Sequence, residues 1–363
     1  MEFKHIEAGK VMTYPKAMIR HLDIDGNLIE KNYKTSISSD TLVKMYENMV
    51  KSRAWDNYAL TLQKTGRLGT FAPSLGEEAL LTAVGYSMKD EDFFVPHYRV
   101  LGALLARGVS YEQIYLYWKG SELGGSFFNK NILPYQVIIG AQISQAAGVA
   151  YAIKAKGEKK VALTMIGNGG TNEGEFHEAL NLAAVRKLPL VVVISNNQWA
   201  ISVPEHNSYS VPTLSQRAMS YGIPGIRVDG NDLLAVSEVL NEAVEWARNN
   251  NGPVLVEAVT WRQGQHTTSD DPRVYRSREM EEEKEKWEPF HRIEKYLFEH
   301  GLITQAKIDS LYEKYTEEAK AANESSNARL TEEGYDDIYK YTYETLPAEL
   351  EEQKQENMRF LKK

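Results

Sequence analysis

Two short polar turns carry the side chains best suited to binding chemistry. Asn168 stands in the glycine-rich turn 167–170, after the aliphatic run 161–166, and Asn197 lies 29 residues further on, after the run 190–194. If the two runs are adjacent parallel strands, their carboxyl ends meet at the sheet edge where such folds bind ligands. Two amide oxygens, a backbone carbonyl, phosphate oxygens and a water would form an oxygen shell suited to magnesium. Asparagines at strand ends also serve simply to satisfy turn amides, which is the alternative explanation.

The glycine turn lies directly before a predicted helix. Its apolar residues recur at helical spacing on one face, and the pair Asn172 and Glu175 has the spacing of a capping box. Bare backbone amides and the positive end of a helix dipole favour phosphate at such a turn. Glycine is also used there only for tight packing, so the turn alone is weak support for a phosphate site.

Short β-branched runs alternate with helical patterns through the middle of the chain. This alternation indicates an α/β fold, with a mainly parallel, doubly wound sheet covered by helices on both faces. We expect an N-terminal extension over residues 1–40, a ligand-binding domain over 41–277 and a C-terminal helical arm, making subunit contacts, over 278–363. The expected strands are Phe93–Val95, 161–166, 190–194, 226–228 and 254–259.

Composition excludes several classes of protein. The 363 residues carry a formal charge of −8, which does not suit a protein that coats nucleic acid. The sequence contains no cysteine, so thiol nucleophiles, iron–sulfur clusters and cysteine-bound zinc are excluded. It lacks an apolar run long enough to span a membrane and a signal-like N-terminus, so we expect a cytoplasmic protein.

The two turns resemble the thiamine-diphosphate motif, in which a Gly-Asp-Gly turn is followed at similar spacing by Asn-Asn. This chain reads Gly167-Asn168-Gly169 and then Asn196-Asn197. The closer similarity is to the alpha subunit of the decarboxylase component of 2-oxo acid dehydrogenase complexes. It extends from about residue 40 to about residue 350.

The resemblance implies a set of ligands for thiamine diphosphate and magnesium. Asn168, Asn197 and the backbone oxygen of Trp199 would hold the metal, while Gly169 and Gly170 would lie against the diphosphate. The chain departs from the family at Asn168, where the family has aspartate. Asparagine keeps an oxygen ligand but removes a negative charge beside a divalent cation, so we expect a working site with weaker metal affinity.

Two further segments match the family. Tyr98 and Arg99 follow the run Phe93–Val95, and the resemblance implies that both reach the diphosphate. The planar fork of arginine suits this task because it can donate two charge-assisted hydrogen bonds to phosphate. In the second segment, the backbone of Val137 and the side chain of Ile139 would lie nearest the cofactor rings.

A long polar loop follows the last expected strand. The loop 262–272 is too long for a tight turn, which is typical of a functional loop. The resemblance implies that its His266 approaches the diphosphate and the reacting centre as a catalytic residue. Glu77 and Glu78 match the alpha subunit's own helix, so neither is assigned as the carboxylate that activates the cofactor's aminopyrimidine ring.

The reaction that the resemblance implies is oxidative decarboxylation of pyruvate, with reductive acetylation of a lipoyl group on an acyltransferase partner, which supplies acetyl-CoA. The segment 66–73 looks more like the pyruvate branch than the branched-chain 2-oxo acid branch, which is the alternative. The chain holds the pattern of one cofactor domain only. The resemblance implies that a beta subunit completes the site, in an alpha2-beta2 heterotetramer.

Two hypotheses from other functional classes are alternatives to a 2-oxo acid dehydrogenase subunit. Asn168 could mark a catalytically silent scaffold subunit, which would not bind magnesium and thiamine diphosphate. A nucleotide-binding oxidoreductase would need a G-x-G-x-x-G turn with an acidic residue about 20 positions later, and the turn at 167–170 has neither.

Overall fold

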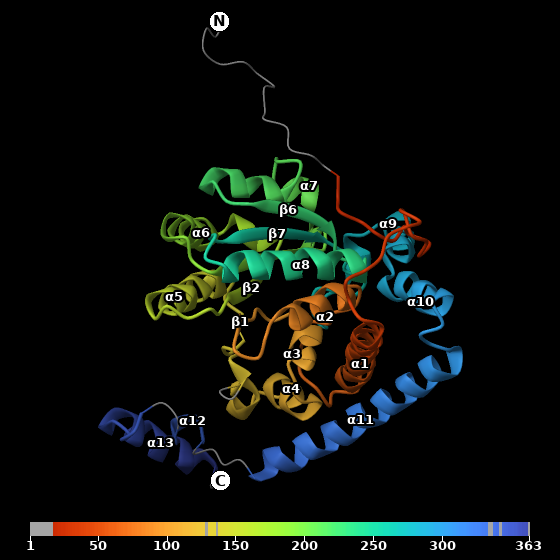
Figure 1. The fold of residues 1–363 in the computed structure, drawn as a ribbon. Helices are drawn as coiled ribbons and strands as arrows, with labels where there is room; N and C mark the ends of the chain where they lie inside the picture. The colour runs from red at the N-terminus through yellow and green to blue at the C-terminus, as the bar shows by residue number, and fades with distance from the viewer. Residues whose placement is uncertain (1–16, 128–129, 136, 333–336, 341–342, 362–363) are drawn as a thin grey trace, which may run out of the picture.

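A five-stranded, fully parallel sheet forms the centre of the molecule (Figure 1). The computed structural model describes residues 17–127, 130–135, 137–332, 337–340 and 343–361. A separate antiparallel hairpin pairs β4 (Trp199–Ala200) with β5 (Val203–Pro204). In spatial order the sheet consists of β1 (Phe93–Val95), β2 (Ala162–Gly167), β3 (Leu190–Asn196), β7 (Val254–Val259) and β6 (Gly225–Asp229).

Helices cover both faces of the sheet, which explains why the strands are apolar almost throughout. In β3, Leu190, Val192 and Ile194 pack with α5 (Ala141–Ala155) and α6 (Gly174–Arg186). The alternate residues Val191 and Val193 belong to the core on the opposite face, which includes α8 (Leu233–Arg248). Figure 1 shows α8 crossing the near face of the sheet.

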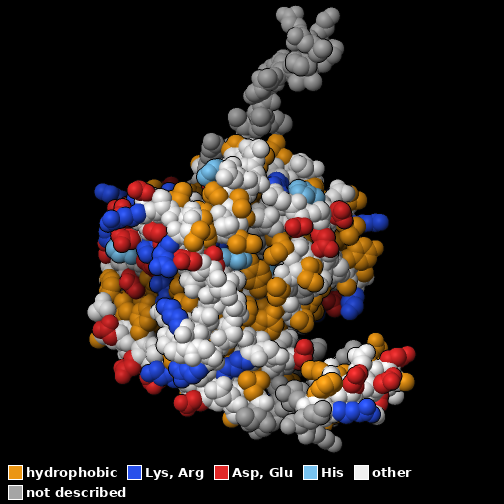
Figure 2. All heavy atoms as spheres, turned by 180° about the vertical axis from the view of Figure 1, so that it is seen from behind, with side chains coloured by type: hydrophobic (Ala, Val, Ile, Leu, Met, Phe, Trp, Pro, Cys, Tyr) orange, Lys and Arg blue, Asp and Glu red, His pale blue; other side chains and the backbone are white. Residues whose placement is uncertain are grey.

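The other helices lie around this core, with α7 beside the β4–β5 hairpin and α1, α4 and α11 packed together on another side. Figures 1 and 2 both show α12 and α13 standing apart from the sheet, while α11 runs back along α1 and α4. None of the helices in the described part of the chain combines the length and apolar character needed to cross a membrane. Besides α5, α6 and α8, the α-helices of the described residues are α1 (Ser39–Lys64), α2 (Glu78–Ser87), α3 (Leu101–Ala106), α4 (Tyr111–Trp118), α7 (Glu205–Ser208), α9 (Arg278–Glu283), α10 (Pro289–Glu299), α11 (Gln305–Glu332), α12 (Asp337–Lys340) and α13 (Ala348–Leu361).

The predicted fold class and all five predicted strands are confirmed, but the predicted capping box is wrong. A 3₁₀ turn, η3 (Gly169–Asn172), separates β2 from α6, whose N-cap is Glu173. Asn172 instead donates to the carbonyl of Ser208 and accepts from Arg217. A partner distant in the sequence therefore takes the hydrogen bonds that local spacing assigned to the helix.

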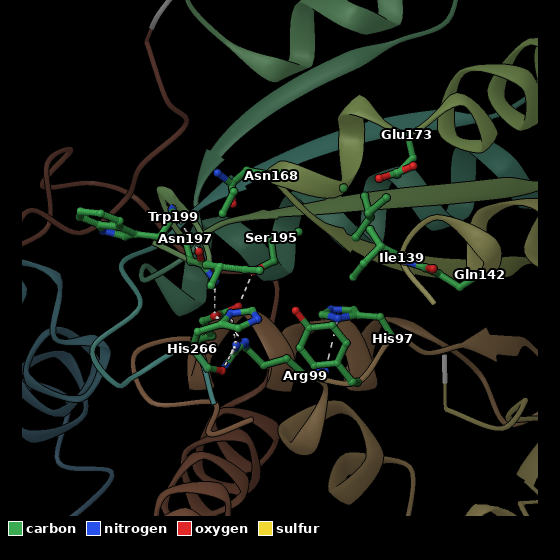
Figure 3. A pocket seen from close by; sticks show the side chains of 18 residues that line it. His97, Arg99, Ile139, Gln142, Asn168, Glu173, Ser195, Asn197, Trp199 and His266 are labelled. Atoms are coloured by element: carbon green, nitrogen blue, oxygen red, sulfur yellow. Dashed lines mark hydrogen bonds and ion pairs between the residues drawn. The ribbon is translucent and has the colours of Figure 1, made fainter. Parts of the chain in front are cut away.

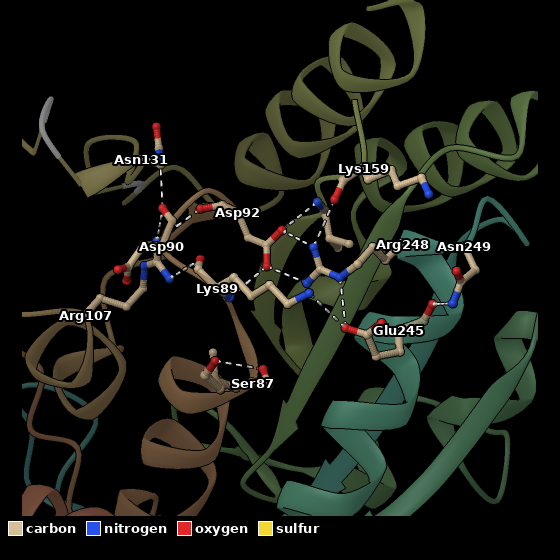
Figure 4. Close-up of polar contacts among 12 residues, drawn as sticks. Ser87, Lys89, Asp90, Asp92, Arg107, Asn131, Lys159, Glu245, Arg248 and Asn249 are labelled. Carbon is tan, nitrogen blue, oxygen red and sulfur yellow. Dashed lines mark hydrogen bonds and ion pairs between the residues drawn. The ribbon is translucent and has the colours of Figure 1, made fainter. Parts of the chain in front are cut away.

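A buried ion pair ties the amino ends of β1 and β2 to the end of α8 (Figure 4). The two terminal nitrogens of Arg248 donate to Asp92 over 2.8 and 2.7 Å, and the Asp92 side chain is fully buried. The same carboxylate accepts from the backbone N–H groups of Val161 and Lys89. Asp92 thus takes four donors from three segments of the chain.

Arg248→Ala is expected to destabilise the protein by about 3–5 kcal/mol, because it leaves the Asp92 carboxylate buried without its cation. Urea unfolding of the chain measures this loss. Arg278→Ala is the matched control, since Arg278 pairs with Glu282 on the surface of α9, and its loss is expected below about 1 kcal/mol. Equal losses in the two variants would contradict the assignment of Asp92 and Arg248 as a stabilising buried pair.

Candidate active site

A pocket of about 240 Å³ opens at the carboxyl ends of β2 and β3 (Figure 3). The turn after β1 and the loop after β7 close its other sides. The structure brings together nine of the ten predicted site residues here; Val137 is not part of the lining, and 59 % of the residue is exposed. The lining comprises Glu77, His97, Tyr98, Arg99, Ile139, Gln142, Ile166, Gly167, Asn168, Gly169, Gly170, Glu173, Ser195, Asn197, Trp199, Ala200, Ile201 and His266.

Asn168 begins the glycine turn and is almost fully buried. Its backbone carbonyl accepts from the Thr171 hydroxyl over 2.7 Å, while its side-chain nitrogen is buried with no hydrogen-bond partner among the described residues. Amide oxygen and nitrogen are assigned from their neighbours, so this amide is free to present its oxygen to a ligand. Crowding explains the next two glycines, because a Cβ at Gly169 would lie 2.6 Å from Ala200 and one at Gly170 would lie 2.9 Å from Ile139.

Asn197 is held from two sides. Its side-chain oxygen accepts from the backbone N–H of Trp199 over 3.3 Å, and its side-chain nitrogen donates to Glu77 over 2.8 Å. Gln198, between Asn197 and Trp199, adopts a left-handed conformation with φ 69°, at the turn that connects β3 to the β4–β5 hairpin. The turn thus places the Asn197 amide and the Trp199 backbone beside Asn168 at one edge of the sheet.

Arg99 crosses the floor of the pocket with 3 % of its side chain exposed. Its terminal nitrogens donate to the carbonyls of Pro73 and His266, and its Nε lies 3.7 Å from Glu77. A guanidinium has five N–H groups, so at least one stays available to an anion. Tyr98 lies beside it, with its ring edge-on to the ring of His266.

The loop after β7 brings His266 over the pocket. The backbone N–H of His266 donates to the Asp270 carboxylate over 2.9 Å, and the hydroxyl of Tyr275 donates to the same carboxylate. Burial, followed by the positive charges of Arg99 and Arg262, lowers the pKa of His266 to about 4. The imidazole is therefore neutral at pH 7, and its Nδ1 accepts from Arg99 and Arg262 over 3.3 and 3.4 Å, which leaves its Nε2–H as a donor.

Comparison with known proteins decides the family. The model of the dehydrogenase E1 component family matches residues 46–333. The chain belongs to the dehydrogenase E1 component family. Its relatives include the pyruvate dehydrogenase E1 component alpha subunits of Mycoplasma pneumoniae, 42 % identical over 96 % of this chain and 97 % of the relative, and Mycoplasma genitalium, 41 % identical over the same shares. That of Staphylococcus aureus strain Mu50 is 38 % identical, over 93 % and 91 %. The resemblance inferred from the motifs is thereby confirmed at the level of the family.

Sequence reasoning missed part of this E1 pocket. Glu77, His97, Gln142 and Ser195 line it without having been predicted as ligands. The position of Ser195, directly before the Asn-Asn pair at the end of a predicted strand, could have indicated a place at the sheet edge. Glu77 was considered only for a different role, and its contact with Asn197 spans 120 residues of sequence, so no local pattern signals it.

The E1 chain is expected to lose stability at mildly acidic pH partly through His266. The unfolded imidazole binds a proton below its ordinary pKa of about 6.5, whereas the folded one does so only near pH 4. The contribution of this group is therefore complete above pH 6.5 and is lost as the pH falls toward 4. Between pH 7 and pH 5, wild type should lose on the order of 2 kcal/mol more than His266→Gln. Urea unfolding of both proteins at the two pH values measures the difference, and identical pH dependence would contradict the lowered pKa.

Proposed function

We propose that this chain is the alpha subunit of a pyruvate dehydrogenase E1 component, an oxidoreductase that decarboxylates pyruvate with thiamine diphosphate and magnesium. The proposal rests on two observations taken together. Relatives with this name match nearly the whole of this chain and of their own length, and one pocket gathers the motif residues at a single edge of the sheet. Neither a lone asparagine turn nor fold class would support as much.

The residues present fit both groups. Asn168 offers a buried amide with unmade hydrogen bonds, Asn197 an amide oxygen with a spare lone pair, and Trp199 a backbone carbonyl, all of them the oxygen donors that magnesium prefers. Arg99 retains an N–H for the diphosphate, and Tyr98 adds a hydroxyl at the same wall. Thiamine diphosphate, when bound, supplies the electron sink that decarboxylation of a 2-oxo acid requires.

The protein side of the reaction rests on position and protonation. His266 is neutral at pH 7 and its Nδ1 accepts from Arg99 and Arg262, so its Nε2–H can donate a hydrogen bond at the reacting centre. Arg99 holds the carbonyl of His266 and thereby couples the loop 262–272 to the floor of the pocket. The side chain of Ile139, against Gly170, gives the cofactor rings an apolar surface.

A beta subunit is proposed to complete the site. Ile139 and Ile201 line the pocket and are 43 % and 57 % exposed, and Ile138, which precedes Ile139 in the chain, is 75 % exposed. Contiguous exposed apolar residues of this kind mark protein interfaces. The alpha designation of the relatives agrees with a second kind of subunit. The acetyl group would pass to the lipoyl-bearing acyltransferase partner.

The decisive assay uses the chain co-purified with the product of a neighbouring reading frame. The complex is expected to decarboxylate pyruvate in a reaction that requires added thiamine diphosphate and magnesium, and the chain alone is expected to be inactive. A preference for 3-methyl-2-oxobutanoate would establish the branched-chain alternative. Absence of cofactor binding to the complex would establish the silent scaffold, the alternative that the asparagine at position 168 raises.

Asn168→Asp is expected to tighten magnesium binding about tenfold, or ~1.4 kcal/mol, because it adds a full negative charge at a proposed ligand. Calorimetric titration of the complex with magnesium, at saturating thiamine diphosphate, measures the change. In the absence of metal the same variant should melt at a lower temperature, since a carboxylate replaces a buried neutral amide. Unchanged magnesium affinity would show that Asn168 is not a ligand.

A further inference from the structure

Glu77 is a buried carboxylate at the back of the pocket that the proposed function leaves without a role. Only 1 % of the residue is exposed. One of its oxygens accepts from the side-chain nitrogen of Asn197 over 2.8 Å, and the other accepts from the hydroxyl of Ser195. Both contacts lie at the carboxyl end of β3, where the chain continues into the proposed metal ligands Asn197 and Trp199.

The carboxylate fixes which way the Asn197 amide faces. A carboxylate only accepts hydrogen bonds, so the side-chain nitrogen of Asn197 must lie toward Glu77. The backbone N–H of Trp199, on the other side, requires the amide oxygen. The two neighbours independently demand the same orientation, and the oxygen keeps a second lone pair beyond the bond from Trp199.

Glu77 is also the buried negative charge of the pocket lining. The other carboxylate of that lining, Glu173, is exposed to solvent. Arg99 pairs with Glu77 only loosely, at 3.7 Å, because its terminal nitrogens donate to the carbonyls of Pro73 and His266 and to the His266 ring. The proposed protein ligands of magnesium, two amides and a backbone carbonyl, are all neutral.

We propose that Glu77 is a positioning residue for the metal site, which orients Asn197 and makes its oxygen a stronger ligand. The hydrogen bond from the amide nitrogen to a carboxylate polarises the amide and increases the negative charge on its oxygen, as carboxylates behind metal ligands do elsewhere. The proposal deepens the proposed function and rests on it. It places the missing ligand charge behind Asn197 rather than at position 168.

Manganese(II) is a suitable probe, because its free ion is counted directly by electron paramagnetic resonance. The alpha–beta complex is titrated with manganese at saturating thiamine diphosphate. Glu77→Gln should weaken manganese binding by roughly 10–100-fold, the range expected when a partner behind a metal ligand is lost. Glutamine fills the same space and can still accept from Asn197, while the Ser195 hydroxyl can turn to accept from its amide nitrogen, so the variant removes chiefly the negative charge.

Glu78→Gln is the matched control. Glu78 follows Glu77 in the chain, is equally buried and pairs with Arg53, yet it does not line the pocket. This variant should lower the melting temperature while manganese affinity stays within about threefold of wild type. A loss of manganese affinity equal to that of Glu77→Gln would overturn the proposal. It would show that losing either buried carboxylate weakens metal binding by disturbing the fold, and not through a contact with Asn197.

A double variant tests the role of charge. Asn168→Asp, added to Glu77→Gln, should bring manganese affinity back to within about threefold of wild type, since a carboxylate returns to the ligand set. A double variant as weak as Glu77→Gln alone, or a Glu77→Gln variant as tight as wild type, would overturn the inference while leaving the proposed function intact. Failure of wild type to bind manganese with thiamine diphosphate would reject both.

Discussion

The parallel pairing of β2 with β3 is the constraint on which the site depends. The register sets Gly167 opposite Ser195, so the chain leaves both strands at the same level of the sheet. The residues that follow in each strand, Asn168 after β2 and the Asn196-Asn197 pair at the end of β3, therefore lie at the same edge of the sheet. A shift of one residue in either strand would exchange the side chains that pack in the two cores, and close packing on both faces of the sheet opposes that exchange.

The loop after β7 is held in place by a different kind of interaction. Arg276 is buried, with its guanidinium 5.0 Å from the ring of Trp199 and 5.7 Å from that of Trp261. It also donates to the carbonyl of Arg262, within the loop itself. The aromatic groups therefore join the hairpin that carries a proposed metal ligand to the loop that carries His266. Displacement of either segment would disturb the other.

The sequence predicted what depends on local pattern and missed what depends on distant contact. Strands were recognisable because a sheet covered on both faces needs apolar runs, and the motif spacing followed from that topology. The capping box at Asn172 failed because Ser208 and Arg217 supply partners that no local rule contains. Glu77 was unrecognisable as a partner of Asn197 for the same reason, since only the folded chain brings residues 120 positions apart into contact.

The polarity of the pocket supports the proposal that a second subunit completes the site. Its inner wall is built from buried polar groups whose hydrogen bonds are largely made within this chain, as at Arg99 and Asn197. Its lining includes the exposed isoleucines 139 and 201, whose apolar surface is unfavourable in water. A self-contained pocket would reverse this arrangement, with apolar depth and a polar mouth. These isoleucines are therefore better explained as surface that a second subunit covers, which would place the cofactor between the two chains and exclude water from it.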